Sequence, residues 1–508
     1  MQSYRGLSLL DTRWGTVLIA LGASLICIVY GIGIGYAVSP LLLVFIPLAL
    51  AIGLGALVRP EIGAVVLLSI RWGYLSEIAV RFHHVPSIAT FLFALLVVAV
   101  VLRRFSGRQT PLAYDQTTWW MLAYLFVIAL GLWYAVAPNR VMELLIDFAK
   151  SVLLYLVLIN LITSIRLFER SMWLLLAVGA LLGTLTLYQE ITHSYDSNFG
   201  GLARMEIAQI ASGVHDRPRA SGTIGDPNAY GQLLLVLVPI GLWALVQGRT
   251  LLERIGAGYA TCACLAGVVL SFSRGAYLAL AVVLILFALH IRLNPRYLLV
   301  ILPLIGLVWW FTPPEVSARF GTLEELLPGG KGVNSEESYL GRFVSMRMAI
   351  NMFGDHPLLG VGGWNYSTHY QNYIREDGSR VADEIHVAHS YYLEIAAEHG
   401  LAGLLVVGGI IVLTLRRLRL AQHLFTSAGN RRMAELAALL QMSFAAYLVS
   451  AAFLPGSYTR YLWLQVNWAV ALACIARRYV VLRTDRSAYT ELLNHQDTKA
   501  QRLHVKGS

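Results

Sequence analysis

A histidine at the mouth of a long apolar segment is the first candidate for chemistry in this chain. His389 closes the longest polar interval of the sequence, and Ser390 and an apolar run follow it. Imidazole has an unperturbed pKa of about 6.5, so it can take a proton from a hydroxyl group near neutral pH. We therefore expect His389 to act as a general base.

Other polar residues near His389 suggest a metal site as an alternative to a general base. His386 lies three residues earlier and can share a helical face with His389. With Asp383 and Glu384 the pair suggests a metal site, but no further ligand stands at a suitable spacing, so we expect neither metal nor cofactor. Glu398 follows nine residues later, about half a turn round a helix, so it is not expected to pair directly with His389. His386 and Glu398 are expected to support the site.

Two arginines precede a glycine-rich turn and the start of a helix. Arg217 and Arg219 lead to Asp226, which can cap that helix, and to Pro227, which suits its first turn. An ordinary loop with a capped helix explains the cap but not the arginines. Free backbone N–H groups beside guanidinium groups favour an anion, so we predict an anion site that Asn228 supports.

Two further arginines stand where apolar segments begin or meet polar ones. Arg274 occupies the very tight connection 271–277, and Arg342 lies in an amphipathic stretch near 341–353. Arg274 could simply extend to the membrane surface, and Arg342 and Arg347 could face lipid headgroups. A guanidinium on a short rigid turn nevertheless suits bidentate contact with phosphate. We expect Arg219 and Arg274 to bind an anion such as phosphate, with Arg342 and Arg217 next.

The composition shows what must position these residues. Of the 508 residues, 57% are hydrophobic and 13% are charged, which a soluble protein of this size could not bury. The net charge of +10 is spread over the loops between apolar runs, as in proteins that orient themselves in a bilayer, and does not indicate nucleic acid.

The apolar runs are each long enough to cross a bilayer as a helix. We predict an all-α transmembrane bundle of 12–14 helices with a large periplasmic loop containing short helices. The expected segments lie near 15–36, 38–58, 62–80, 86–102, 117–136, 147–164, 171–188, 226–247, 254–271, 275–291, 297–311, 390–415, 433–454 and 461–476.

Lys and Arg are concentrated in alternate loops, which predicts cytoplasmic N- and C-termini. The expected domains are transmembrane helices over 1–311 with a periplasmic loop at 189–225, a large periplasmic loop at 312–389, and C-terminal transmembrane helices over 390–480. The polar tail 481–508 is expected to be cytoplasmic and disordered.

Three charged residues fall inside the predicted membrane segments. Arg71 and Glu77 lie in the third segment and Lys150 in the sixth, where charges are costly. They leave a transporter open as an alternative, with these charges lining a path, while Arg71 could also pair with a carboxylate. A transporter would place its functional charges near the midplane and would need no large outer loop. Here the distinctive residues gather at one face.

Taken together, the motifs resemble the O-antigen ligase and polymerase superfamily of bacterial inner-membrane proteins, over about residues 60–475. The residues that carry the resemblance are Arg219, Gly222 and Asp226–Asn228, then Ser273–Gly275, His356–Gly362, His389, Ser390, Leu393, Glu394, Glu398 and Gly400. Many members have Asn where this chain has Ser390. The order of the motifs and the long outer loop also match.

The resemblance implies a GT-C-like glycosyltransferase that acts at the periplasmic face without a metal. The donor would be a glycan on undecaprenyl diphosphate, and the acceptor a sugar hydroxyl of lipid A–core, as in an O-antigen ligase. A repeat-unit polymerase or a protein O-oligosaccharyltransferase is the alternative. His389 would act as the base and the arginines would stabilise the leaving diphosphate. A single displacement would invert the anomeric centre.

Overall fold

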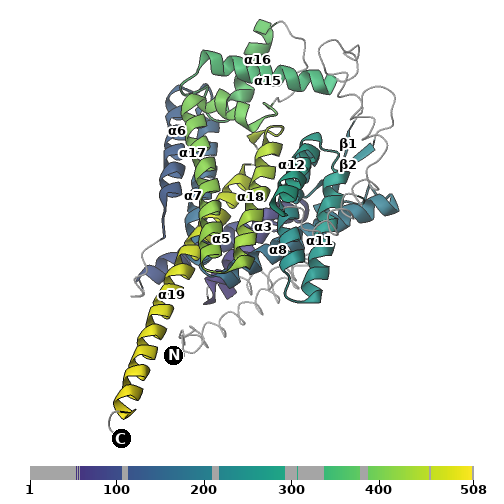
Figure 1. Cartoon of the computed structure of the whole chain (residues 1–508). Helices are drawn as coiled ribbons and strands as arrows, with labels where there is room; N and C mark the ends of the chain where they lie inside the picture. The colour runs from purple at the N-terminus through teal and green to yellow at the C-terminus, as the bar shows by residue number, and fades with distance from the viewer. Residues whose placement is uncertain are drawn as a thin grey trace, which may run out of the picture.

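The computed structural model describes residues 58–105, 113–208, 217–291, 337–377, 387–456 and 459–505, together with isolated positions at 53, 55, 56 and 306. These residues form a mostly helical protein, which confirms the predicted all-α class (Figure 1). The predicted segments near 15–36 and 297–311, and most of 38–58, lie outside the described residues.

The helices follow the apolar runs of the sequence. In the first half they are α3 (Pro60–Trp72), α4 (Leu75–His83), α5 (Ile88–Phe105), α6 (Gln116–Tyr134), α7 (Pro138–Leu161) and α8 (Ile165–Thr192). In the second half they are α9 (Pro227–Leu235), α10 (Leu237–Gln247), α11 (Leu251–Leu270), α12 (Arg274–Ile291), α15 (Glu337–Asp355), α16 (Tyr366–Asp377), α17 (Tyr391–Ser427), α18 (Arg431–Ala451) and α19 (Arg460–Val505).

Within the described part of the chain, six helices are long and apolar enough to cross a bilayer. The count becomes seven if α3 and α4, which meet at an angle of 63°, form one broken span. Each of these spans falls on a predicted segment, and the shorter apolar helices α5 and α12 fall on two more.

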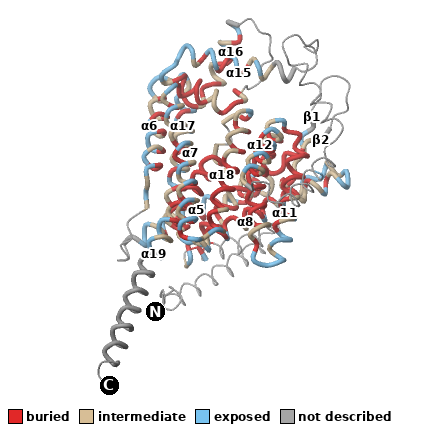
Figure 2. The backbone as a smooth tube through the Cα atoms, in the orientation of Figure 1, coloured by how far each residue is buried: buried red, intermediate tan, exposed pale blue. Residues whose placement is uncertain are grey.

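The span Pro227–Gln247 is the most buried of the candidate spans among the described residues. Every residue from Ala229 to Ala244 is buried, as expected for a helix that is apolar all round. The segment divides into α9 and α10 at Val236 because Pro239 has no N–H for the helical hydrogen-bond ladder. Figure 2 shows that the buried residues gather around α8, α11, α12 and α18.

Ion pairs connect the loops that the charge pattern assigns to the cytoplasmic side. Glu169, near the start of α8, pairs with Arg249 at 3.1 Å and with Arg432 at 2.9 Å. Arg417 pairs with Asp115 at 2.7 Å, so α17 and the start of α6 meet at the same end of the bundle. These contacts agree with the alternation of loops that the sequence predicts.

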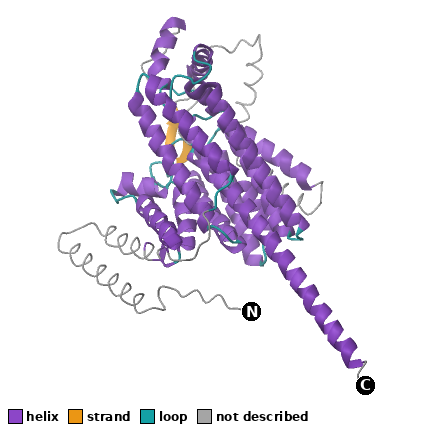
Figure 3. Ribbon diagram, turned by 90° about the vertical axis from the view of Figure 1, so that its left-hand side faces the viewer, coloured by secondary structure: helices purple, strands orange, loops and turns teal. Residues whose placement is uncertain are grey.

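The opposite end carries a two-stranded antiparallel sheet and a helical cover. Strands β1 (Arg204–Ala208) and β2 (Arg217–Gly222) stand where the sequence predicts only a loop (Figure 3). Helices α15 and α16 lie over this end (Figure 1). We call residues 337–377 the roof.

The roof has its own small core. Met348, Met352, Tyr366 and Tyr370 pack with Ala397 of α17 in a cluster separate from the main core. The predicted amphipathic stretch near 341–353 is therefore helical, and one of its faces packs on the protein. This packing fixes the roof on α17.

A break in α17 receives the turn between α15 and α16. At Gly400 the backbone leaves the helical region, with φ 61° and ψ −156°. The carbonyls of Ala397 and Glu398 accept hydrogen bonds from Val361 and Gly362 of the roof, each at 2.9 Å. In return, the N–H groups of Leu401 and Ala402 donate to the carbonyls of Pro357 and Leu358, at 2.7 and 3.1 Å.

The last helix extends beyond the expected boundary. The sequence predicts disorder over 481–508, but α19 continues as a helix to Val505 and projects from the bundle (Figure 1). Residues 490–503 contain Glu, Leu, Gln, Lys, Ala and Arg, which favour helix, so local propensity opposes the predicted disorder.

The break in α17 gives a first prediction. A Cβ at position 400 would lie 2.5 Å from the backbone carbonyl carbon of Leu358, and the φ of 61° with ψ −156° is accessible to glycine only. Gly400→Ala should therefore destabilise the roof by about 1–3 kcal/mol or more. The measurements are the thermal midpoint in detergent and the rate of proteolysis within the roof.

Gly408→Ala is the matched control, because this glycine of α17 has no atom within 4 Å of an added Cβ. It should leave stability unchanged or raise it slightly, since alanine favours helix. Equal stability of the two variants would show that the break does not hold the roof.

Candidate active site

Arg219 joins the two arginine motifs that the sequence singles out. Its Nε donates a hydrogen bond to the Ser271 carbonyl at 3.1 Å, and its Nη2 donates to Asn228 Oδ1 at 3.3 Å. Strand β2, the start of α9 and the α11–α12 turn therefore meet at one guanidinium. Asn228 is held in turn by Asp226, which caps α9 through the Asn228 N–H at 2.7 Å.

The α11–α12 turn presents Arg274 from a rigid base. Ser271 and Ser273 are buried, while Arg274, the first residue of α12, is exposed. The Ser271 hydroxyl donates to the Val268 carbonyl at 2.7 Å, and Ser273 Oγ accepts from the Ala276 N–H at 3.3 Å. The turn thus fixes the backbone of Arg274 three residues from the carbonyl that Arg219 binds.

A carboxylate that sequence reasoning missed stands opposite Arg219. Glu206 of β1 pairs with Arg219 in the antiparallel register. Partial burial raises the pKa of Glu206, and the positive charges of Arg219 and Arg342 partly offset that rise. Arg342 of the roof and Arg219 of β2 therefore both lower the pKa of the same carboxyl group. Hairpin pairing of residues 204–208 with 217–222 was the signal that could have found Glu206.

His389 lies directly before the start of α17 in a strained backbone conformation. Its φ is 51°, in the left-handed region that non-glycine residues seldom adopt. Its side chain is half-buried, whereas Ala388 and Ser390 on either side are buried. The neighbours fix the position of the imidazole, and such outliers are frequent in functional sites.

The α18–α19 turn connects the start of α17 to the start of α12. The Gly456 N–H donates to the Glu394 carboxylate of α17 at 2.9 Å. Phe453 lies against Gly275, where an added Cβ would come within 3.0 Å of the phenylalanine Cβ. One turn therefore borders both the helix start that follows His389 and the helix that begins at Arg274.

A pocket lies beside this turn. Its lining includes Tyr124, Trp364, Tyr391, Glu394, Glu398 and Trp463, contributed by α6, the roof, α17 and α19. The aromatic wall was not predicted, because its members are far apart in sequence and look like ordinary core residues. Glu398 is buried and accepts from the Tyr366 N–H at 3.0 Å, so it holds the roof.

The structure thus brings Arg219 and Asn228 into contact. Arg342 and Arg219 both act on the Glu206 carboxyl group, and Arg219 binds the α11–α12 turn that leads into Arg274. His386 and the side chain of Arg217 lie outside the described residues. Among the residues that the structure describes, no group of three or more His, Cys, Asp or Glu side chains could hold a metal ion.

Part of this end of the molecule matches the model of a known protein family. A family model described as O-antigen ligase (Wzy_C) matches residues 259–408. The match includes the Arg274 turn, the roof, His389 and the break at Gly400, and Arg219 lies before it. No curated protein matches the chain.

Glu206 gives a prediction about anion binding. Glu206→Gln should tighten binding of a diphosphate such as farnesyl diphosphate by about fivefold, because removing a competing charge near the surface is worth about 1 kcal/mol. Protonation has the same effect as the substitution. Because the pKa of Glu206 is raised, wild-type affinity should gain as the pH falls through that pKa, and the variant should lack this gain.

Dissociation constants measured between pH 5 and 8 provide the test. Glu190→Gln is the control, because this carboxylate accepts a hydrogen bond from Tyr195 on the same side of the protein. If Glu206→Gln bound the diphosphate as wild type does at every pH, Glu206 would have no part in tuning the arginines.

Proposed function

We propose that this membrane protein of the O-antigen ligase family, a glycosyltransferase-type enzyme family, moves a glycan from undecaprenyl diphosphate to a sugar hydroxyl of lipid A–core. The observation that carries the proposal is the position of Arg219. Its guanidinium is bound to the Ser271 carbonyl on the turn that leads into Arg274. Two arginines on rigid backbone can meet a diphosphate where its negative charge develops.

The arginines perform the electrostatic part of the reaction. The bond between the anomeric carbon and the diphosphate oxygen breaks, and the diphosphate leaves with an additional negative charge. Arg219 and Arg274 stabilise that charge, with Arg342 and Arg217 contributing from the roof and from β2. Fixed guanidinium groups supply this stabilisation without a divalent cation.

His389 performs the proton transfer. The acceptor hydroxyl gives its proton to the imidazole as its oxygen forms a bond with the anomeric carbon on the face opposite the leaving group. This single displacement inverts the anomeric centre. The partial exposure of His389 and its left-handed backbone, fixed between buried neighbours, support the role of a positioned base.

The side of the membrane follows from charge. The loops that are rich in Lys and Arg meet at one end of the bundle, and the arginine site stands at the other. Cytoplasmic N- and C-termini and a periplasmic site in the bacterial inner membrane are consistent with this arrangement. The donor carrier and the acceptor would both reach the site from the outer leaflet.

The central test is His389→Ala in the purified protein. Loss of a general base costs about 10²–10⁴-fold in rate, so transfer should fall by that factor while donor binding persists. His193→Ala is the control, since His193 also has a positive φ (53°) but ends α8 outside the site. Near wild-type turnover of the His389 variant would refute the assignment.

The acceptor can be identified in the same assay. Lipid A–core, a growing repeat-unit chain and a serine-containing peptide are offered in turn with one donor. Transfer to lipid A–core alone supports the ligase, whereas transfer to another acceptor identifies a polymerase or a protein O-oligosaccharyltransferase.

Arg219→Lys and Arg274→Lys give a second prediction for this function. A lysine keeps the charge but loses the two parallel N–H contacts, and charge-assisted hydrogen bonds are worth about 1.5–3 kcal/mol. Each variant should therefore lose roughly tenfold to a hundredfold in kcat/KM for the donor. Arg375→Lys, on an exposed part of α16, should have no effect. Unchanged kinetics in both site variants would remove these arginines from the mechanism.

A further inference from the structure

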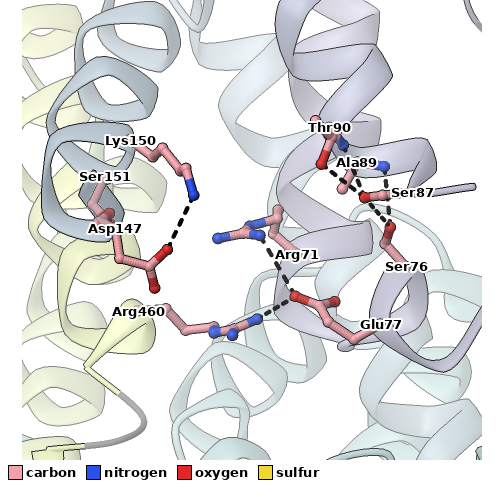
Figure 4. Close-up of polar contacts among 10 residues, drawn as sticks. All are labelled: Arg71, Ser76, Glu77, Ser87, Ala89, Thr90, Asp147, Lys150, Ser151 and Arg460. Carbon is pink, nitrogen blue, oxygen red and sulfur yellow. Dashed lines mark hydrogen bonds and ion pairs between the residues drawn. The ribbon is translucent and has the colours of Figure 1, made fainter. Parts of the chain in front are cut away.

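A second group of charged residues lies at the start of α19. Arg71 of α3 pairs with Glu77 of α4, with Nη1 3.5 Å from Oε1, and Arg460 Nη1 donates to the same oxygen (Figure 4). The sequence singles out Arg71 and Glu77 as costly charges, and the pairing of Arg71 with a carboxylate is confirmed. Glu77 is thus shared between two guanidinium groups.

The group has an excess of positive charge. The side chain of Lys150 on α7 points toward Arg71, and Asp147 is its partner at 3.4 Å (Figure 4). Three cations therefore stand around two carboxylates, a net charge of +1. One carboxylate oxygen cannot satisfy two guanidinium groups, which together carry ten N–H donors.

A pocket lies where these donors converge. Arg71 and Arg460 line it together with Ser151 and Asn467, and Leu154, Trp463 and Leu464 form its apolar wall. The cavity is about 10 Å³, which is room for one phosphate oxygen, so the rest of a phosphate would meet the partly exposed guanidinium groups. Trp463 also lines the pocket beside Glu394, so the two pockets are neighbours.

Two further charged side chains of α7 are exposed near this pocket. The side chains of Lys150 and Asp147 are 62% and 61% exposed, although α7 is one of the helices able to span a membrane. Charged side chains that face hydrocarbon are costly, so a polar group must meet them. Arg460 begins α19 directly after the turn that borders the arginine site, which places the pocket near the outer headgroup level.

Holding α4 against α19 does not account for the whole group. Glu77 with Arg460 alone would make that link, and Arg460 also stacks on Tyr74, 4.5 Å from the ring centroid. Arg71, Lys150 and the polar lining of the pocket remain to be explained. The side chains of Arg71 and Lys150 are partly exposed, so both can reach a bound anion.

We propose that the pocket between Arg71 and Arg460 binds the phosphate group of an amphiphile. The inference rests on the proposed function, because an enzyme that joins two lipid-anchored substrates needs a second headgroup site apart from the donor diphosphate at Arg219 and Arg274. A phosphorylated glycolipid acceptor held here would extend its sugars past Trp463 toward His389. An ordinary phospholipid carries the same phosphate chemistry and is the other source.

The test measures binding to the full chain in detergent by native mass spectrometry. The probes are a diphosphorylated, acylated glucosamine disaccharide, the same glycolipid without phosphates, and phosphatidylglycerol. Wild type should bind the phosphorylated glycolipid at least tenfold more tightly than the phosphate-free one. Arg71→Gln and Arg460→Gln should each remove most of that difference, and Lys150→Gln should reduce it about threefold.

Glu77→Gln separates a binding role from a merely structural one. Removing the competing carboxylate should strengthen phosphate binding severalfold, whereas a purely structural cluster would show a lower thermal midpoint and no gain in affinity. Arg103→Gln is the control, because Arg103 pairs with Glu61 at 2.6 Å between α3 and α5, away from the pocket. It should bind all probes as wild type does.

Each outcome has a definite meaning. Preference for the phosphorylated glycolipid over phosphatidylglycerol supports an acceptor site, and equal affinity supports a phosphate site that ordinary phospholipid fills. Equal binding of the phosphorylated and phosphate-free glycolipids, or unchanged binding in the Arg71 and Lys150 variants, overturns the proposal. If only the proposed function is wrong, the protein should still prefer the phosphorylated glycolipid, although no acceptor receives a glycan.

Discussion

The exchange of backbone hydrogen bonds at Gly400 is the constraint on which the outer end of this protein depends. A helix broken within a membrane-spanning segment leaves N–H and C=O groups that hydrocarbon cannot satisfy. Here the turn of the roof supplies both kinds of partner, through Val361 and Gly362 as donors and Pro357 and Leu358 as acceptors. The break and the roof therefore require each other.

This exchange also organises the groups around the candidate active site. Glu398 lies next to the break and accepts from the Tyr366 N–H, while Glu394, one turn earlier, accepts from Gly456 of the α18–α19 turn. Two carboxylates of one helix thus hold the roof on one side and the α18–α19 turn on the other. His389 precedes that helix, so its position depends on both attachments.

The charges of the bundle serve different purposes at its two ends. At the end rich in Lys and Arg, Arg417 pairs with Asp115, and Arg249 and Arg432 share Glu169, so these charges join loops of the bundle. At the other end, Arg71 and Arg460 share Glu77 beside the Lys150–Asp147 pair, and Arg219 and Arg342 both act on Glu206. Excess positive charge favours binding of an anion, and the group around Glu77 has one cation more than its carboxylates.

The sequence by itself determined the helical class, most of the spans and the grouping of the loops, because apolar length and Lys/Arg bias are local properties that the bilayer imposes. It also identified the segments of Arg219, Arg274 and Arg342 and predicted the cap of Asp226. Only the tertiary structure decided that Arg219 binds the Ser271 carbonyl, that Glu206 stands opposite it, and that Arg71 shares Glu77 with Arg460. These contacts join residues 6 to 383 positions apart. The distant ones, Arg219 with Ser271 and Arg460 with Glu77, depend on how separate elements pack, which no local pattern specifies.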